Sequence, residues 1–169
     1  MRNLILLASI IAIGCSCNSN SDMEMSLMER QEIADTIKST MHELFALNKD
    51  YTMDGFEKKM SLFIEPNDEA WMNNPALFVN MLQIVEDKEI AREDMIRILE
   101  SRTGTIYDIE KEYVAVLSPE SAIYVFKGTF SIIRSNGVSS ANFPMTGSYV
   151  FVLRDDGWKI LHMHQTWTN

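Results

Sequence analysis

Cysteine is scarce in this chain: Cys15 and Cys17 are the only two among 169 residues, and both lie at the end of an apolar N-terminal segment. The rest of the chain has none, which excludes a disulfide-stabilised core, a zinc–thiolate site and a cysteine nucleophile from the globular part. Basic side chains are also outnumbered, 15 against 24 acidic ones, for a formal net charge of −9. Because no basic stripe is available to meet phosphate, the sequence argues against a nucleic-acid partner.

Nothing in the composition indicates disorder or several domains. With 46% hydrophobic and 23% charged residues, the chain is typical of a globular protein. Its length allows one domain with a hydrophobic core, and neither an internal repeat nor a second-domain linker interrupts the sequence. The excess of acidic side chains is interpreted as a soluble surface.

The N-terminal residues 1–14 have the order of a secretory signal. One basic residue, Arg2, precedes the apolar run Leu4–Ile13, and the small residue Gly14 comes directly before Cys15. This run is too short to span a bilayer as a permanent helix, so we interpret the segment as a signal that is removed.

The end of this segment, Ala12-Ile13-Gly14-Cys15, resembles the lipobox of bacterial lipoproteins, which are cut before a cysteine that becomes lipidated. The resemblance implies a signal peptide over residues 1–14, acyl chains on Cys15 that anchor the protein to a membrane, and a polar tether over residues 15–25. The protein is then expected in the bacterial cell envelope, as a periplasmic or outer-membrane lipoprotein. The alternative is an ordinary secreted protein whose cysteines are incidental.

Three helices are predicted from the spacing of apolar residues. The clearest spans Ser26–Asn48, where Ser26 and Glu29 match a capping box. A shorter helix is expected over Tyr51–Met60, and a third over Lys88–Arg102.

Strands dominate the second half of the chain. They are predicted over Glu69–Met72, Ala76–Val85, Thr105–Leu117, Ala122–Ile133, Ser148–Leu153 and Trp158–Thr166. The segment Ala76–Val85 could also form a helix, but its length and β-branched residues favour a strand. Helices first and a run of antiparallel strands last indicate an α+β protein.

The last two strands are expected to form a hairpin, because Gly157 supplies the positive φ of a tight turn. Two registers are open: a two-residue turn centred on Asp156-Gly157, or a three-residue turn with a bulge at Gly157. The first pairs Phe151 with His162 and Tyr149 with His164, and the second pairs Val150 with His162 and Ser148 with His164. We favour the first register because it gathers aromatic side chains beside the histidines.

Strict alternation along the last strand defines two faces. One face carries Trp158, Ile160, His162, His164 and Thr166. The opposite face carries Lys159, Leu161, Met163, Gln165 and Trp167. The second set is too apolar to remain in water, so we expect a second copy of the chain to cover it in a homodimer.

From Ser26 onward the chain resembles the nuclear transport factor 2 (NTF2) superfamily, and within it the SnoaL-like domains. The resemblance lies in the order of the elements and in the ending Asp156, Gly157, Trp158, Lys159, Ile160, His162 and His164. It implies that residues 26–169 form a cone, in which a curved antiparallel or mixed sheet wraps around the long N-terminal helix and leaves a pocket at its open end. Members of the superfamily include ketosteroid isomerase, scytalone dehydratase and polyketide cyclases, so the fold alone does not select a function.

In such a cone the histidine face would line the pocket, where His162 or His164 could act as general acid or base. The expected ligand pocket is lined by Trp71, Tyr124, Tyr149, Phe151 and Trp158, and Phe63 and Tyr51 could complete its apolar lining. The histidines could equally be hydrogen-bonded wall residues. Two histidines without a third ligand do not form a metal site, so we expect neither a metal nor a cofactor.

Three functions follow from this interpretation. The favoured one is an envelope-anchored protein that binds a small apolar molecule in its cone. The alternative is an enzyme of the isomerase, dehydratase or cyclase type that uses a pocket histidine. A structural interaction module remains open if side chains fill the cone.

Overall fold

The computed structural model describes residues 25–64, 78–79, 84–85, 88–99, 102–137 and 139–167. Its elements in chain order are α1 (Leu27–Leu47), α2 (Met53–Met60), β1 (Phe78–Val79), β2 (Ile84–Val85), α3 (Lys88–Leu99), β3 (Arg102–Ser118), β4 (Ser121–Arg134), β5 (Phe143–Arg154) and β6 (Gly157–Trp167). The predicted signal peptide, Cys15 and the strand over Glu69–Met72 lie outside the described residues. Within the described part, no helix is long and apolar enough to cross a membrane.

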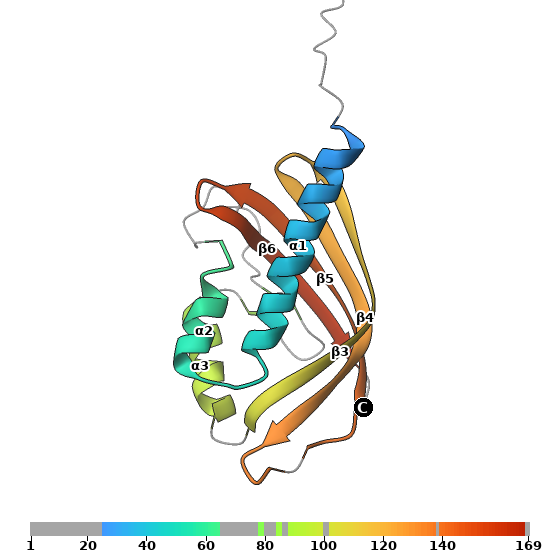
Figure 1. Cartoon of the computed structure of the whole chain (residues 1–169). Coiled ribbons are helices and arrows are strands. Elements are labelled where there is room, and N and C mark those ends of the chain that lie inside the picture. The colour runs from blue at the N-terminus through green and yellow to red at the C-terminus, as the bar shows by residue number, and fades with distance from the viewer. Residues whose placement is uncertain are drawn as a thin grey trace, which may run out of the picture.

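Helix α1 forms where the apolar period predicted it and begins at the predicted capping box. The Ser26 hydroxyl accepts from the Glu29 amide at 3.2 Å, and the Glu29 carboxylate accepts from the Ser26 amide at 2.8 Å. One face of the helix buries Ile37, Met41 and Leu44. The helix crosses the curved sheet diagonally (Figure 1), so this buried face becomes the axis of the core.

The two shorter helices pack side by side at one end of the sheet (Figure 1). Thr52 caps α2, where its hydroxyl accepts from the Gly55 amide at 3.0 Å. Helix α3 begins at Lys88 as predicted but ends at Leu99, and Arg102 already belongs to β3.

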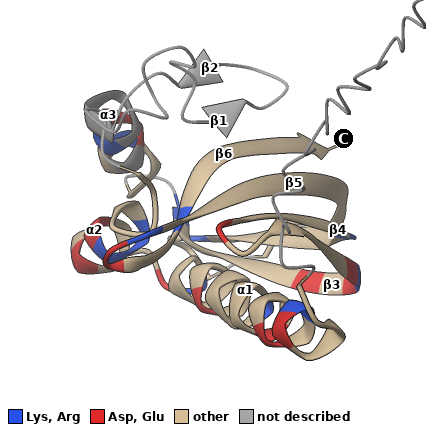
Figure 2. Ribbon diagram, turned by 90° about the horizontal axis from the view of Figure 1, so that it is seen from above, with Lys and Arg blue, Asp and Glu red and all other residues tan. Residues whose placement is uncertain are grey.

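The sheet has six strands in the order β2-β1-β6-β5-β4-β3. Strands β3 to β6 form an antiparallel meander, and β1 adds to β6 in parallel. Seen from above, the sheet curls and α1 lies along its β3 side (Figure 2). This is the predicted α+β cone, with a mixed sheet wrapped around the first helix.

The single strand predicted over Ala76–Val85 is wrong. The segment contains two short strands, and β1 and β2 pair with each other antiparallel through Phe78 opposite Val85 and Val79 opposite Ile84. The chain therefore reverses inside a run whose composition favours an uninterrupted strand.

The core lies between α1 and the concave face of the sheet. Its fully buried large side chains are Tyr124, Tyr149, Phe63, Phe151, Ile37, Met41, Leu44 and Ile160. Phe45 of α1 joins the two layers, because its ring lies 4.8 Å from that of Tyr107 and 5.2 Å from that of Phe126.

The hairpin register differs from the favoured prediction. Arg154 pairs with Gly157, so the two-residue turn is Asp155-Asp156 rather than Asp156-Gly157. Further along, Phe151 pairs with Ile160 but Val150 pairs with His162, which leaves Leu161 as the extra residue of a β-bulge. The pairs of the alternative register, Val150–His162 and Ser148–His164, are therefore formed, through a bulge at Leu161 and not at Gly157.

Candidate functional site

The bulge at Leu161 decides which way the last strand faces. Before it Ile160 is fully buried, and after it Met163 is buried in the same core. His164 is exposed and His162 is half-buried on the opposite face. The prediction that both imidazoles point into the cone is wrong, because the extra residue shifts the alternation by one position.

The same shift corrects the predicted dimer face. Met163 is buried, and Gln165 and Trp167 line a cavity on the concave side of the sheet. They are not available to a second copy of the chain.

Four of the residues predicted to line the pocket lie in the core or against it. Tyr124, Tyr149 and Phe151 are fully buried in the core, and Trp158 packs against it, half-buried. None of these four lines either of the two cavities described below. Trp71 lies outside the described residues.

A cavity of about 320 Å³ opens at the end of the cone where β3 begins and β6 ends. Its lining is Tyr51, Arg102, Thr105, Tyr107, Phe130, Ile132, Phe143, Met145, Gln165 and Trp167. The apolar wall is a run of packed rings, since Phe130 lies 5.3 Å from Phe143 and 6.2 Å from Trp167. An apolar wall with a few polar groups is typical of small-molecule sites.

Hydroxyl and amide groups gather at this cavity. The Tyr51 hydroxyl and Thr105 Oγ1 lie 2.5 Å apart, and Gln165 Nε2 donates to the buried Tyr149 hydroxyl at 2.6 Å. Tyr107 lies near enough to Tyr51 and Tyr149 for these two side chains to help raise its pKa. The site is thus built from the connection between α1 and α2 and from the four strands β3, β4, β5 and β6.

These tyrosines remain neutral phenols. Burial raises the pKa of Tyr51, Tyr107 and Tyr149 above the ordinary tyrosine value. At neutral pH their hydroxyls can therefore donate hydrogen bonds but cannot serve as bases.

Tyr51 reaches the cavity because the connection between α1 and α2 rests on the beginning of β3. The Tyr51 amide donates to the Thr103 carbonyl at 2.7 Å, and the Thr105 amide donates to the Asn48 carbonyl at 2.6 Å. A Cβ on Gly104 would lie 2.0 Å from the Lys49 carbonyl oxygen, so only glycine permits this approach.

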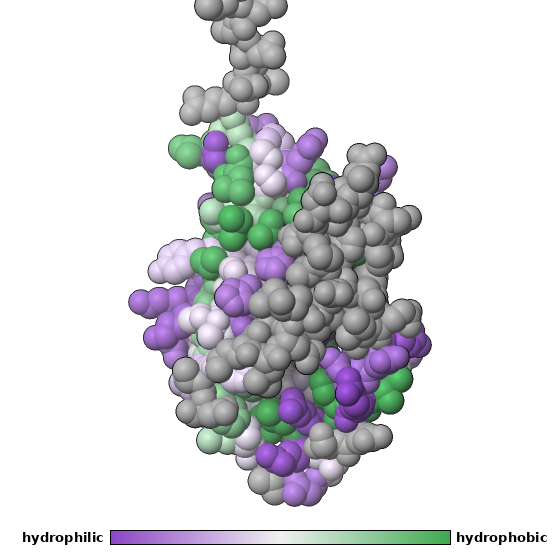
Figure 3. Space-filling model, turned by 180° about the vertical axis from the view of Figure 1, so that it is seen from behind, coloured by the Kyte–Doolittle hydropathy of each residue, from purple (hydrophilic) through white to green (hydrophobic). Residues whose placement is uncertain are grey.

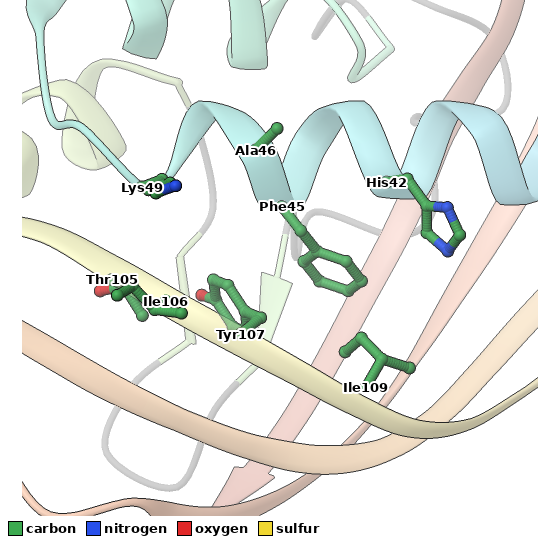
Figure 4. A pocket seen from close by; sticks show the side chains of 8 residues that line it. All are labelled: His42, Phe45, Ala46, Lys49, Thr105, Ile106, Tyr107 and Ile109. Carbon is green, nitrogen blue, oxygen red and sulfur yellow. The ribbon is translucent and has the colours of Figure 1, made fainter.

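A second hollow of about 330 Å³ lies between α1 and β3. Figure 4 shows Phe45 pointing from α1 toward Tyr107 and Ile109 of β3, with His42 at one end. Its lining is His42, Phe45, Ala46, Lys49, Thr105, Ile106, Tyr107 and Ile109.

Beside this hollow, Glu112 ties α1 to the sheet. Its Oε2 accepts from the Tyr124 hydroxyl at 2.7 Å and lies 3.0 Å from His42 Nε2. Partial burial disfavours the carboxylate, but the hydrogen bonds from Tyr124 and His42 outweigh it and lower the pKa of Glu112. We interpret the cluster as structural, because a core tyrosine and a surface histidine meet on one carboxylate oxygen.

Among the described residues, no three His, Cys, Asp or Glu side chains gather in a way that could hold a metal ion. Sequence reasoning named Tyr51 as a lining residue, and the structure places it in the cavity. Gln165 and Trp167 were assigned to the wrong face, and Arg102 and Tyr107 carried no recognisable motif.

Comparison with known proteins identifies the fold. No protein-family model and no curated protein matches the sequence. A candidate dehydratase of the NTF2-like family from Streptomyces avermitilis superposes with a TM-score of 0.66 at 13% identity, covering 83% of this chain and 99% of that one. Hexachlorocyclohexane dehydrochlorinase from Novosphingobium barchaimii gives 0.63 at 10% identity, covering 85% and 92%.

The association domain of C. elegans CaMKII is also similar, with a TM-score of 0.56 at 14% identity and coverage of 82% of this chain and 97% of that one. At such identities the likeness establishes the fold alone. The chain has the NTF2-like fold that its sequence resembles.

Proposed function

With the NTF2-like fold as the premise, we propose that this protein binds a small, largely apolar molecule bearing an oxygen acceptor in the cavity at the open end of its cone. The observation that carries the proposal is the set of neutral donors, Tyr51, Tyr107 and Gln165, beside an aromatic and aliphatic wall, in a lining that Thr105 and Arg102 complete. The volume of about 320 Å³ lies at the lower end of the range for small-molecule sites.

The polar groups set the chemistry of the ligand. A ligand that offers a carbonyl or similar oxygen can accept from these donors, and each such hydrogen bond contributes about 0.5 to 1.5 kcal/mol. The rings of Phe130, Phe143 and Trp167 favour a flat apolar body.

Calorimetric titration with naphthalene-2-carboxamide tests the proposal. We expect measurable binding to the wild-type protein and a loss of about tenfold in Tyr107→Phe, since one hydrogen bond contributes about 1 to 1.5 kcal/mol. Tyr113→Phe is the matched control, because Tyr113 is 63% exposed on the far side of the same strand. Absence of heat with the wild-type protein, or equal losses in both variants, would contradict the proposal.

The enzyme alternative stays a second proposal, supported by the dehydratase and dehydrochlorinase among the structural neighbours. On this chain an elimination would need a base other than His162 or His164, because neither lines the cavity. Chloride release from hexachlorocyclohexane is the direct assay. Release that persists in His164→Ala would support it, and no release would remove it.

We also propose that Cys15 carries acyl chains and holds the protein in the bacterial cell envelope. Leu27 and Met28, at the start of α1, are 86% and 71% exposed and follow the tether directly. Figure 3 shows hydrophobic residues reaching the surface near the start of α1. Growth with labelled palmitate should label the wild type and not Cys15→Ser; label on both would contradict the proposal.

We also propose a homodimer, formed through a different face of the sheet from the one predicted from the sequence. Tyr113, Leu117 and Val125 leave exposed apolar surface on the outer side of β3 and β4, which a second copy could cover. Light scattering should give a dimer for the wild type and a monomer for Leu117→Glu. A wild-type monomer at micromolar concentration would exclude it.

A further inference from the structure

Among the described residues, the cavity lining contains one charged side chain, and that side chain is a cation. Arg102 is half-buried at the beginning of β3 and belongs to the lining, whose other members are all uncharged. Its charge acts on Tyr51, where it opposes the rise in pKa that burial causes. The guanidinium therefore lies close to the polar end of the cavity.

Within the described ranges, Arg102 has neither an ion pair nor a side-chain hydrogen bond. Several other cations do have carboxylate partners: Arg92 pairs with Glu57, Lys127 with Glu110 at 3.3 Å, and Lys58 with Glu43 at 2.7 Å. The chain has 24 acidic side chains, so carboxylates that could pair with an arginine are numerous. A half-buried guanidinium without a partner loses hydration and gains nothing in return.

A second arginine, Arg134, lies directly opposite Arg102 in the β3–β4 ladder, and its side chain is exposed. It follows Phe130 and Ile132 along the same face of β4, and both of those residues line the cavity. Like charges directly opposite each other on a sheet are destabilising, and an anion bound at this end would relieve the repulsion.

We propose that the ligand of this cavity is an amphipathic carboxylate, whose carboxylate pairs with Arg102 at the mouth while its apolar body lies against the aromatic wall. This inference rests on the proposed function and adds the charge of the ligand to it. A planar guanidinium binds a carboxylate through two parallel hydrogen bonds, which fixes the orientation of the bound molecule. Arg134 contributes long-range attraction from the rim, where water weakens it.

The test compares three naphthalene probes by calorimetry: naphthalene-2-carboxylate, naphthalene-2-carboxamide and 2-naphthyl phosphate. The first two share their shape and differ in charge. We expect the wild-type protein to bind the carboxylate at least about tenfold more tightly than the carboxamide, in keeping with a charge-assisted hydrogen bond. We expect the phosphate to bind no more tightly than the carboxylate.

The variants identify the cation. Arg102→Gln should abolish the preference for the carboxylate while leaving carboxamide affinity within about twofold, and Arg102→Lys should retain part of the preference. Arg134→Gln should have a smaller effect. Lys111→Gln is the matched control, since it removes one exposed positive charge from β3 outside the cavity and should change nothing.

The outcomes separate the two proposals. Equal binding of carboxylate and carboxamide, or a preference that survives Arg102→Gln, overturns the carboxylate inference and leaves the proposed function standing. Tighter binding of the phosphate overturns the assignment of a carboxylate. Binding of none of the three probes by the wild-type protein removes the proposed function itself.

Discussion

Phe151 and Ile160 lie directly opposite each other on β5 and β6, and both side chains are fully buried. The next pair is Val150 and His162, so Leu161 is the extra residue of a β-bulge in β6. That residue moves the histidines out of the cone and brings Gln165 into it. The composition of the candidate site thus depends on one irregularity in the last strand.

Single-residue deletions test this arrangement. Removing Leu161 should leave every later pair of the hairpin in place, because Val150 would still face His162, and the unfolding free energy should fall by less than about 2 kcal/mol. Removing His164 should turn Gln165 and Trp167 out of the cone and cost at least about 3 kcal/mol. Urea denaturation of both variants gives the comparison. Equal stabilities would contradict a bulge at Leu161.

Local signals explain why the helices were predictable. The apolar period of α1 and the reciprocal hydrogen bonds of Ser26 and Glu29 depend on residues that are close together in the sequence. The structure reproduces both features. The meander was predictable for the same reason, from turn residues between β-rich runs. The curved sheet around α1 follows from the resemblance to the NTF2-like fold, which the structural neighbours bear out.

The faces of β6 were not predictable, since nothing in Trp158–Trp167 departs from strict alternation. The bulge is fixed by tertiary contacts: the Ile160 amide donates to the Leu62 carbonyl at 2.7 Å, the Ile160 carbonyl accepts from the Ile64 amide at 3.1 Å, and Gln165 bonds to Tyr149. The place of Arg102 in the cavity was not predictable, because the cavity is formed by elements that are distant in the sequence and meet only in the folded chain. The sequence predicted this arginine as the last residue of the helix over Lys88–Arg102 and not as part of a cavity wall.

The hydrogen bond between Gln165 and Tyr149 should stabilise the core. Gln165→Leu leaves the buried Tyr149 hydroxyl without this partner, and we expect a loss of about 1 to 3 kcal/mol in unfolding free energy. Tyr149→Phe in the same background should recover part of the loss, because it removes the group left unsatisfied. Chemical denaturation of the four proteins of this cycle measures the coupling, and purely additive effects would contradict it.

Glu112 should make stability depend on pH in the acid range. Its pKa is lower in the folded chain than in the unfolded one, so its contribution is complete above the ordinary carboxyl pKa and is lost as pH falls through the lowered value. Glu112→Gln should therefore flatten the decline in unfolding free energy between about pH 5 and pH 3. Exposed Glu120, in the turn between β3 and β4, supplies the control as Glu120→Gln. Identical pH profiles for all three proteins would refute the role given to the cluster.

Gly104 should tolerate no side chain. In Gly104→Ala the new methyl group would meet the Lys49 carbonyl, and neither backbone can move without breaking the bonds that hold Tyr51 and Thr105. We expect a loss of more than about 3 kcal/mol, measured by thermal denaturation. A loss below about 1 kcal/mol would mean that the connection between α1 and α2 is not fixed to β3 in this way.

The most direct test of the binding cavity is a methyl NMR titration with naphthalene-2-carboxamide. Met145 lines the cavity, whereas Met60 is buried in the core and does not. The ring current of a bound naphthalene should shift the Met145 methyl resonance in proportion to saturation and leave that of Met60 in place. A titration in which Met145 does not move, or in which Met60 moves as much, would contradict binding at the open end of the cone.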